Sequence, residues 1–363
     1  MKQLLREIKH LWEEKTGFKA AAIYLSLIIA VVVLLPFIPL PFSPNELDLE
    51  NPFQRPFDWN AESATGHVHW LGSDALGRDV LANVLFGARS AFFISFPIML
   101  IASGIGLVLG IGAGYFGDSV FTISRAGLVV ACLAALSFFY FGLYLPSNLY
   151  SLHFSFDYIF LSIAILIIIF TLLTKVIHPL ITKWNFLSSS FPFPVDYLVL
   201  RIIEALNSIP SLLLILVIAS FLPPSIFLLS ILIITVSWTS TARLARAETL
   251  RIKQLPYFEA AKSLGVPQKR LLVKHVLPNL LGPVVVSFSF GLAGLLALEA
   301  TLSFLGIGLP TTFVSWGRTI AGIKSNTSAW WLVAFPGAAL ALTVLALQTI
   351  SYHLLNLIQE KKH

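Results

Sequence analysis

The polar stretch that decides this fold reads Gln254-Leu-Pro-Tyr-Phe-Glu-Ala-Ala-Lys-Ser-Leu-Gly-Val-Pro267, and it lies between two apolar runs, 226–242 and 280–305. Of the 363 residues, 57% are hydrophobic and only 12% are charged, whereas a soluble domain has about 25% charged residues. A chain this long cannot cover its surface with so few polar groups, so we expect lipid to surround most of it. These features predict an all-α protein that crosses a membrane several times.

The polar stretch itself predicts two short helices separated by a tight turn. Pro256 suits the first turn of a helix, where its missing N–H group costs nothing, and Glu259 follows where the helix dipole favours an anion. Gly265 readily adopts the left-handed conformation that ends a helix, and Pro267 prevents continuation. A second short helix is expected over 268–276, and we expect both helices to lie across the membrane surface.

The first of these short helices has the form of a docking knob for another protein. Ala260 and Ala261 are strong helix formers, and their small side chains would let a partner's backbone come close. The larger side chains of Tyr257, Phe258 and Leu264 would then fill a pocket in that partner. The residues alone leave one alternative open, which is a solvated amphipathic loop held at anionic lipid by its many lysines and arginines.

Eight apolar runs are candidates for membrane-spanning helices. A span needs about 20 mostly apolar residues, because the hydrocarbon core of a bilayer is about 30 Å thick. The first run ends without the small-x-small pattern of a signal-peptidase site, so we expect it to be retained. The candidate spans are 20–41, 92–115, 120–145, 158–178, 197–221, 226–242, 280–305 and 331–356.

The distribution of basic residues predicts the side of the membrane on which each segment lies. Cytoplasmic segments carry an excess of lysine and arginine. With the N-terminus inside, only five of the 24 lysines and arginines fall outside, and eight spans return the C-terminus to the inside. We therefore expect both termini in the cytoplasm. The five outer basic residues are Arg55, Arg78, Arg89, Arg318 and Lys324.

The opening stretch also carries a family resemblance. Glu259-Ala-Ala261, followed by Gly265 and then by His275-Val-Leu-Pro278, resembles the EAA loop of ABC importer permeases. The run from His275 to Asn279 is similar to the dipeptide, oligopeptide and nickel branch of that family. The resemblance implies that this loop is a coupling helix seated in a cleft of a cytoplasmic ATPase. The residues implied in coupling are Tyr257, Phe258, Glu259, Ala260, Ala261, Leu264, Gly265, His275 and Pro278.

A second resemblance lies before the second span, in His69-Trp-Leu-Gly-Ser-Asp-Ala-Leu-Gly-Arg-Asp79. It is similar to the His-x-Leu-Gly-Thr-Asp-x-x-Gly-Arg-Asp signature of the same branch. Two glycines, two aspartates and one arginine predict a hydrogen-bonded turn whose carboxylates cap the next helix or pair with Arg78. A catalytic carboxylate pair, or a metal pair of His67 and His69, is the less favoured interpretation. The residues of the expected structural turn are Gly72, Asp74, Gly77, Arg78 and Asp79.

The seventh candidate span contains Leu298-Glu-Ala-Thr-Leu-Ser-Phe-Leu-Gly-Ile-Gly308, which resembles the family's Glu-Ala-x-Leu-Ser-Phe-Leu-Gly-x-Gly. An ionisable side chain inside an apolar span is costly, and by default it indicates a functional site. Glu299 and Ser303 are therefore candidates for the transport pathway near its outer gate. The alternative is a hydrogen bond that packs two helices together without a role in transport.

The resemblance covers about 69–118 and 196–350, and the segment between them is absent from the family pattern. This segment contains two apolar runs, so we expect a helical hairpin inserted into a six-helix core. The C-terminus also departs from the family, because it lacks the usual Gly-Asp and Asp-Pro pair. The expected parts are a cytoplasmic tail (1–19), the first span with an extracytoplasmic segment (20–91), a core span (92–118), the inserted hairpin (119–195), and the permease core (196–363) with its coupling loop (243–278).

The resemblance implies a transport subunit of a bacterial inner membrane rather than an enzyme. The chain has no Gly-x-x-x-x-Gly-Lys-Ser/Thr phosphate cradle, so ATP and Mg²⁺ are expected on two partner ATPases, and no cofactor or metal is expected on this chain. The other implied partners are a second permease, an extracytoplasmic solute-binding protein and membrane lipid, without nucleic acid. Peptides are the favoured cargo.

Two other functions stay open at this point. An ion-driven secondary transporter would need buried carboxylates in broken helices near the middle of the membrane. A structural membrane subunit without a pathway would tolerate alanine at Glu299 and in the outer turn.

Overall fold

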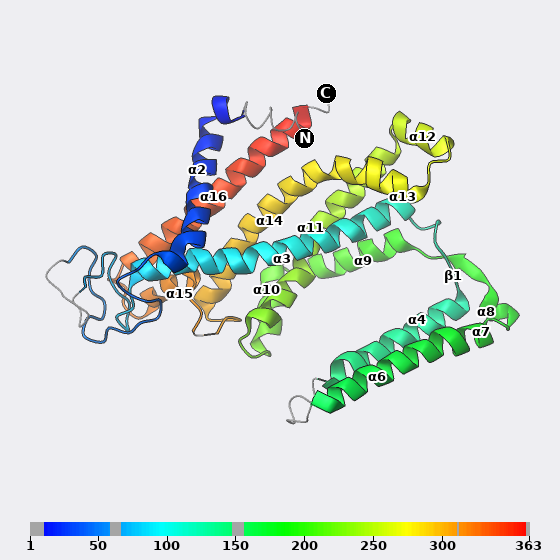
Figure 1. Ribbon diagram of the computed structural model, residues 1–363, viewed down its shortest axis with the longest axis horizontal. Coiled ribbons are helices and arrows are strands. Elements are labelled where there is room, and N and C mark those ends of the chain that lie inside the picture. Colours follow the sequence, from blue (N-terminus) through cyan, green and yellow to red (C-terminus); the bar gives the residue numbers. More distant parts are fainter. Residues whose placement is uncertain (1–10, 59–66, 147–155, 311, 361–363) are drawn as a thin grey trace. The chain divides into compact units, whose positions relative to one another are not determined.

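The computed structural model describes residues 11–58, 67–146, 156–310 and 312–360, which are mostly helical (Figure 1). Among these residues, seven helices are long and apolar enough to cross a membrane, and an eighth crossing results if one bent pair of helices forms a single span. The predicted all-α polytopic class is therefore confirmed. The start of the predicted tail, part of the outer segment and the last three residues lie outside the described ranges.

The first of two compact units comprises Met1–Tyr115 and Val199–His363. Helix α14 lies at its centre and packs against α11, α15 and α16, while α16 also packs against α2. The helices of this unit are α2 (Thr16–Leu34), η1 (Leu35–Phe37), α3 (Val80–Phe116), α9 (Val195–Asn207, which begins in the second unit), α10 (Ser211–Ser220), α11 (Ile226–Lys253), α12 (Pro256–Ser263), α13 (Gln268–Leu271), η4 (Leu272–Val276), α14 (Leu277–Leu305), α15 (Trp316–Ala321), η5 (Gly322–Lys324) and α16 (Trp331–Glu360).

Two helices extend well beyond the apolar runs that predicted them. Helix α3 begins at Val80 instead of near residue 92, and its 37 residues span about 55 Å at 1.5 Å per residue. Helix α11 continues past residue 242 to Lys253, because the polar residues that follow the apolar run are mostly good helix formers. Both helices are therefore longer than the hydrocarbon core of a bilayer is thick, and the polar loop after α11 is shorter than the predicted coupling loop, 243–278.

Two further helices differ from the prediction in continuity. The expected surface helix over 268–276 is not separate, because α13 and η4 run into α14 as one helix, Gln268–Leu305. The π-helical turn η4 changes the hydrogen-bond pattern just before Pro278, which has no N–H group to donate. The candidate span 197–221 is broken into two helices, α9 and α10, which meet at 75°. The break precedes Pro210, because a proline disfavours helical geometry in the residue before it.

Helices α3 and α11 are packed unusually closely along three glycines. A Cβ atom on Gly106, Gly110 or Gly114 would lie 2.5, 2.4 or 2.8 Å from a backbone carbonyl oxygen of α11. The glycines recur every four residues on one face of α3, so the two backbones touch along three turns. The α11 carbonyl groups belong to Trp238, Ala242 and Arg246.

The second unit, Phe116–Leu198, is a helical hairpin closed at its base by two short strands. Strand β1 (Thr122–Ser124) pairs antiparallel with β2 (Ser190–Pro192), and the carboxylate of Asp118 accepts a hydrogen bond from the N–H of Tyr197 at 2.9 Å. The two ends of the segment thus lie together, although its status as an insertion stays a prediction. Its helices are α4 (Arg125–Ser137), η2 (Phe138–Tyr144), α6 (Phe156–Leu172), η3 (Leu173–Ile177), α7 (His178–Ile181) and α8 (Asn185–Ser188).

Candidate functional site

The predicted coupling helix is α12, and one buried side chain anchors it to its own unit. Phe258 is 3% exposed and packs in an apolar cluster that includes Leu271, while the ring of Tyr115 on α3 meets it edge-on at 6.4 Å. The expectation that Phe258 fills a partner's pocket is therefore not met in this structure. Leu255, Phe258 and Ala261 recur every three residues, so they form the inward face of α12.

The opposite face of α12 is open. Tyr257 is 45% and Leu264 is 84% exposed, and Glu259 and Ala260 are also exposed. Gly265 ends the helix region with φ +74°, a conformation that a side chain would disfavour. The sequence therefore placed the ends of this helix correctly, and the structure separates an anchored face from an exposed one.

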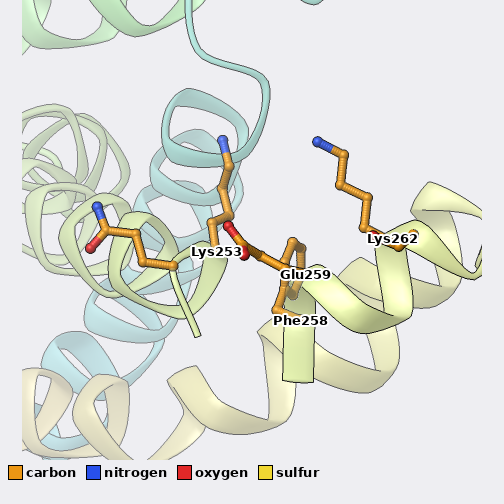
Figure 2. Close-up of a pocket in the computed structure, with 6 residues that line it drawn as sticks. Lys253, Phe258, Glu259 and Lys262 are labelled. Carbon is orange, nitrogen blue, oxygen red and sulfur yellow. The ribbon is translucent and has the colours of Figure 1, made fainter. Parts of the chain in front are cut away.

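A pocket of about 610 Å³ lies beside α12 (Figure 2). Its lining carries positive and negative charges, because two lysines, one at the end of α11 and one on α12, lie in it together with the carboxylate of Glu259. A polar partner surface with charges of both signs would complement such a lining. The lining residues are Lys253, Gln254, Phe258, Glu259, Lys262 and Ser263.

The segment from His275 to Asn279 fastens α12 to the start of α14. The side-chain amide of Asn279 donates to the carbonyl of His275 at 2.6 Å and to the hydroxyl of Tyr257 at 3.3 Å. The rings of Tyr257 and His275 lie 6.1 Å apart. The first turn of α12 is thereby held by two neighbouring residues, by the buried ring of Phe258 and by this contact of Tyr257.

Replacing Phe258 and Leu264 by alanine separately should have opposite consequences. Phe258→Ala removes a buried aromatic side chain and should lower the free energy of unfolding by about 3–5 kcal/mol. Leu264→Ala should leave stability nearly unchanged, because its side chain is mostly in solvent, but it should weaken binding of a cytoplasmic partner. Thermal unfolding of each purified variant measures the first effect, and co-purification measures the second. Equal melting temperatures for the two variants would contradict the anchoring role.

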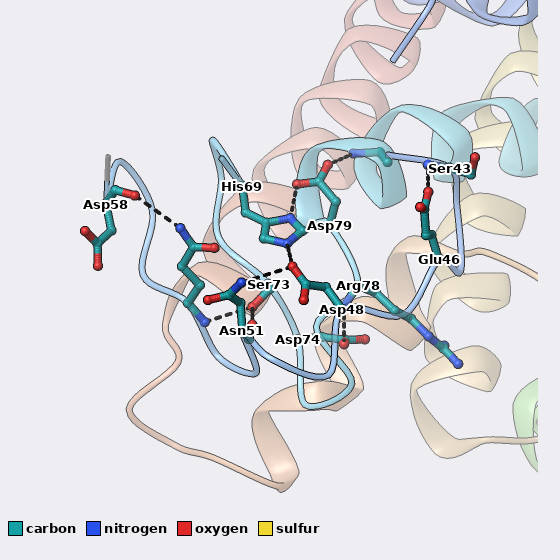
Figure 3. Close-up of polar contacts among 12 residues, drawn as sticks. Ser43, Glu46, Asp48, Asn51, Asp58, His69, Ser73, Asp74, Arg78 and Asp79 are labelled. Carbon is teal, nitrogen blue, oxygen red and sulfur yellow. Dashed lines mark hydrogen bonds and ion pairs between the residues drawn. The ribbon is translucent and has the colours of Figure 1, made fainter. Parts of the chain in front are cut away.

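The predicted outer turn is part of a compact outer cap, residues 43–58 and 67–79 (Figure 3). Gly72 and Gly77 have φ values of +82° and +72°, and a Cβ atom on Gly77 would lie 1.7 Å from the carbonyl oxygen of Asp48. The carboxylate of Asp74 accepts hydrogen bonds from the backbone N–H groups of Leu76 and Arg78 at 2.8 and 3.0 Å. Glycine is needed at both positions, because the backbone there lies against the backbone of Gln54 and Asp48 and leaves no space for a side chain.

A fully buried histidine joins the two halves of the outer cap. The Nδ1 atom of His69 lies 3.0 Å from Asp79, its Nε2 atom lies 3.3 Å from Asp48, and its ring stacks on Phe42 at 4.0 Å. Asp79 also accepts the N–H of Ala82 at 2.7 Å and so caps α3. Asp79 thus pairs with His69 instead of Arg78, and both ring nitrogens of His69 face carboxylates.

Burial by itself lowers the pKa of His69. The hydrogen bonds that His69 makes with Asp79 and Asp48, and the negative charges of these two carboxylates, outweigh this effect, so the pKa is raised above the ordinary value of 6.5. A group whose pKa is higher in the folded state stabilises that state fully below its unfolded pKa. This stabilisation is lost as the pH rises through the folded pKa. The outer cap should therefore be more stable at pH 6 than at higher pH.

We expect the melting temperature of the purified chain to fall as the pH rises from 6 through the raised pKa of His69. His69→Gln should remove most of this pH dependence, since a neutral amide cannot carry the charge between the two carboxylates. His67→Gln is the matched control, because His67 lies two residues from His69 and contacts the same Phe42 ring edge-on. A pH dependence that survives in His69→Gln would contradict this assignment.

Glu299 and Ser303 lie inside the unit instead of on an exposed surface. Glu299 is 2% exposed, and the hydroxyl of Ser303 donates to its carboxylate at 2.7 Å. A Cβ atom on Gly317 would lie 2.0 Å from the carbonyl oxygen of Ala300, so α15 is packed directly on this part of α14. The hydrogen bond to Ser303 lies within α14, and the role of Glu299 and Ser303 in a transport pathway stays a prediction.

The roles of three residues at these sites could not be read from the sequence. There, His69 belongs to a signature and to a less favoured metal pair, Asn279 ends a motif, and Lys253 is one of the basic residues expected on the inner side. The position of His69 ahead of several aspartates was the available signal, but the sequence does not reveal its contact with Asp48. Contacts between segments far apart in the chain decide all three roles.

Comparison with known proteins identifies residues 185–362 with the family described as the binding-protein-dependent transport system inner membrane component. A putative peptide transport system permease protein of Brucella suis is 25% identical over 337 residues, covering 93% of this chain and 85% of that protein. An oligopeptide transport system permease protein of Haemophilus influenzae is 25% identical over 354 residues, covering 95% and 86%.

The match to an oligopeptide transport system permease protein of Escherichia coli is shorter and has a higher sequence identity. It reaches 35% identity over 151 residues, which cover 41% of this chain and 50% of that protein. The family match includes α11 to α16, and therefore both the predicted coupling helix and the α14 segment with Glu299. Together with the apolar helices, these matches show that the chain belongs to the family of binding-protein-dependent transport system inner membrane components and is an ABC transporter permease.

Proposed function

We propose that the chain is the membrane-spanning permease subunit of an ATP-driven peptide importer. Relatives that cover more than nine-tenths of its length are named as permeases for peptides or oligopeptides. The observation that carries the coupling role is the two-sided character of α12. Phe258 holds this helix to its own unit, while Tyr257, Glu259 and Leu264 remain exposed for a partner.

In this proposal, two cytoplasmic ATPases dimerise when they bind ATP and move α12 as a lever. Helix α12 follows α11 after only two residues, and the helix Gln268–Leu305 begins a few residues beyond it. Movement of α12 would therefore be transmitted both to α11 and to the helix Gln268–Leu305. The translocation pathway would lie between this chain and a second permease, with both termini in the cytoplasm and with the solute-binding protein delivering peptides on the side of the outer cap.

The alternative of an ion-driven transporter has less support from the described residues. Such a transporter binds its coupling ion to polar groups near the middle of the membrane. Glu299 is the acidic side chain that stood out within an apolar span, and its carboxylate is already bonded to Ser303 within one helix. The same contact is what a structural role for Glu299 would require.

Purification with partners, followed by reconstitution, tests the proposed function. The tagged chain should be isolated from its own membrane in mild detergent together with ATP-hydrolysing chains and a second permease. In proteoliposomes, the complex should take up labelled peptides only with ATP and a binding protein. Uptake without ATP, driven by an ion gradient, would contradict the proposal, as would cross-links that place 256–276 on the outer side.

A further inference from the structure

Lys253, the last residue of α11, caps the end of another helix. Its ammonium group donates hydrogen bonds to the carbonyl oxygens of Gly114 and Tyr115 at 3.2 and 2.9 Å. These are among the last carbonyls of α3, which have no partner within their own helix. They also carry the partial negative charge of the helix end, where a cation is stabilising. One side chain thus joins the cytoplasmic ends proposed for α3 and α11.

The same side chain reaches the surroundings of α12. Lys253 lines the pocket beside that helix together with Glu259 (Figure 2). Its ammonium group lies 5.8 Å from the ring centroid of Tyr115, and that ring contacts Phe258 of α12 edge-on. The end of α3 is therefore connected to α12 by two routes, through the pocket lining and through Tyr115 to the buried anchor.

The remainder of α3 and α11 is already fixed in relative position. The backbone contacts at Gly106, Gly110 and Gly114 leave no space for sliding or rotation of one helix against the other. Lys253 follows these contacts at the end where α11 leads into α12. Without its hydrogen bonds, the last turn of α3 would keep its apolar contacts, including that of Tyr115 with Phe258, but would lose its polar connection to the end of α11, where α12 begins.

We infer that Lys253 is a positioning residue that transmits movement of the coupling helix α12 to the end of α3. This inference rests on the proposed function, because it assumes that a partner moves α12. A positioning role predicts that a Lys253 variant transports fewer peptides per ATP hydrolysed. If Lys253 only contacted the partner or stabilised the fold, transport and ATP hydrolysis would fall together.

The first test compares Lys253 variants in the complete complex. Lys253→Met should leave assembly and ATP hydrolysis largely intact but reduce the number of peptides transported per ATP by about tenfold, within the usual range for coupling between sites. Lys253→Arg should restore most of that ratio, because it can still donate to both carbonyls. Lys269→Met, on an exposed side chain of α13 that is not among the pocket-lining residues, is the control and should leave the ratio unchanged.

A parallel fall of transport and ATP hydrolysis in Lys253→Met, or an equal loss of the transport ratio in Lys269→Met, would overturn the inference. The wild-type complex separates this failure from failure of the proposed function. If the wild type shows no ATP-dependent uptake, the proposed function fails and the inference falls with it. If the wild type transports normally and Lys253→Met keeps its transport ratio, the inference alone fails.

The second test needs no Lys253 variant and thus does not depend on its folding. Spin labels at Gly112→Cys on α3 and Ser263→Cys on α12, with Cys132→Ser, report the distance between the two helices. A Cβ atom at Gly112 meets nothing within 4 Å, and Ser263 is exposed. The distance should be the same in the ATP-free and ATP-bound complex, because α12 and the end of α3 move together. A distance that changes when ATP binds would overturn the inference.

Discussion

Glu259→Arg is expected to abolish co-purification of the chain with its ATPase partners and ATP-dependent peptide uptake. Glu259 is exposed on the open face of α12 and lines the pocket beside it. Reversing its charge would place a third cation next to Lys253 and Lys262 in that lining. Removing one member of a charge pair at an interface typically costs about 2–5 kcal/mol, and a reversal adds repulsion, so binding should weaken by roughly a hundredfold or more.

The fold of the chain should survive this substitution, which is what makes the experiment informative. Glu259 is exposed, so the melting temperature should stay close to that of the wild type. Glu14→Arg makes the same charge change on the N-terminal segment and should keep the partners. Unchanged partner binding by Glu259→Arg would remove the main support for the coupling role of α12.

The parts of the coupling site that the sequence predicted well are those set by local chemistry. Pro256 at the helix start and Gly265 at its end act through their own backbone conformations, whatever they pack against. The direction in which Phe258 points depends instead on Tyr115 and Leu271, which are distant in the sequence. An aromatic residue beside a docking motif suits either face of the helix, so the sequence could not decide between anchor and contact.

Helix lengths were the weaker part of the fold prediction, for a related reason. Hydrophobic runs show where a helix lies in lipid, but they do not show where it ends. Helix α11 continues through residues that favour helix in water, and α3 begins at the capping carboxylate of Asp79. The network around His69 needs Asp48, which is 21 residues away. The signature predicted a turn there, while only the fold could reveal a buried charge between two acids.

Gly110→Ala should destabilise the chain strongly even though alanine normally favours a helix over glycine. The new Cβ atom would lie 2.4 Å from the carbonyl oxygen of Ala242 and 2.8 Å from the Cβ atom of Ala245. Backbone atoms cannot rotate away as a long side chain can, so α3 and α11 must separate. Overpacking of this kind typically costs about 1–3 kcal/mol, and occasionally more, and we expect a value at the upper end.

Gly112→Ala provides the matched control on the same helix, two residues away. A Cβ atom there meets nothing within 4 Å, so the substitution should be neutral or should stabilise the chain by about 0.5–1 kcal/mol through backbone entropy. Thermal unfolding of both variants in the same detergent measures the difference. Because the helix propensities are identical, a lower melting temperature for Gly110→Ala alone can only come from contact with α11. Equal stability of the two variants would mean that the close packing of these helices does not hold the bundle together.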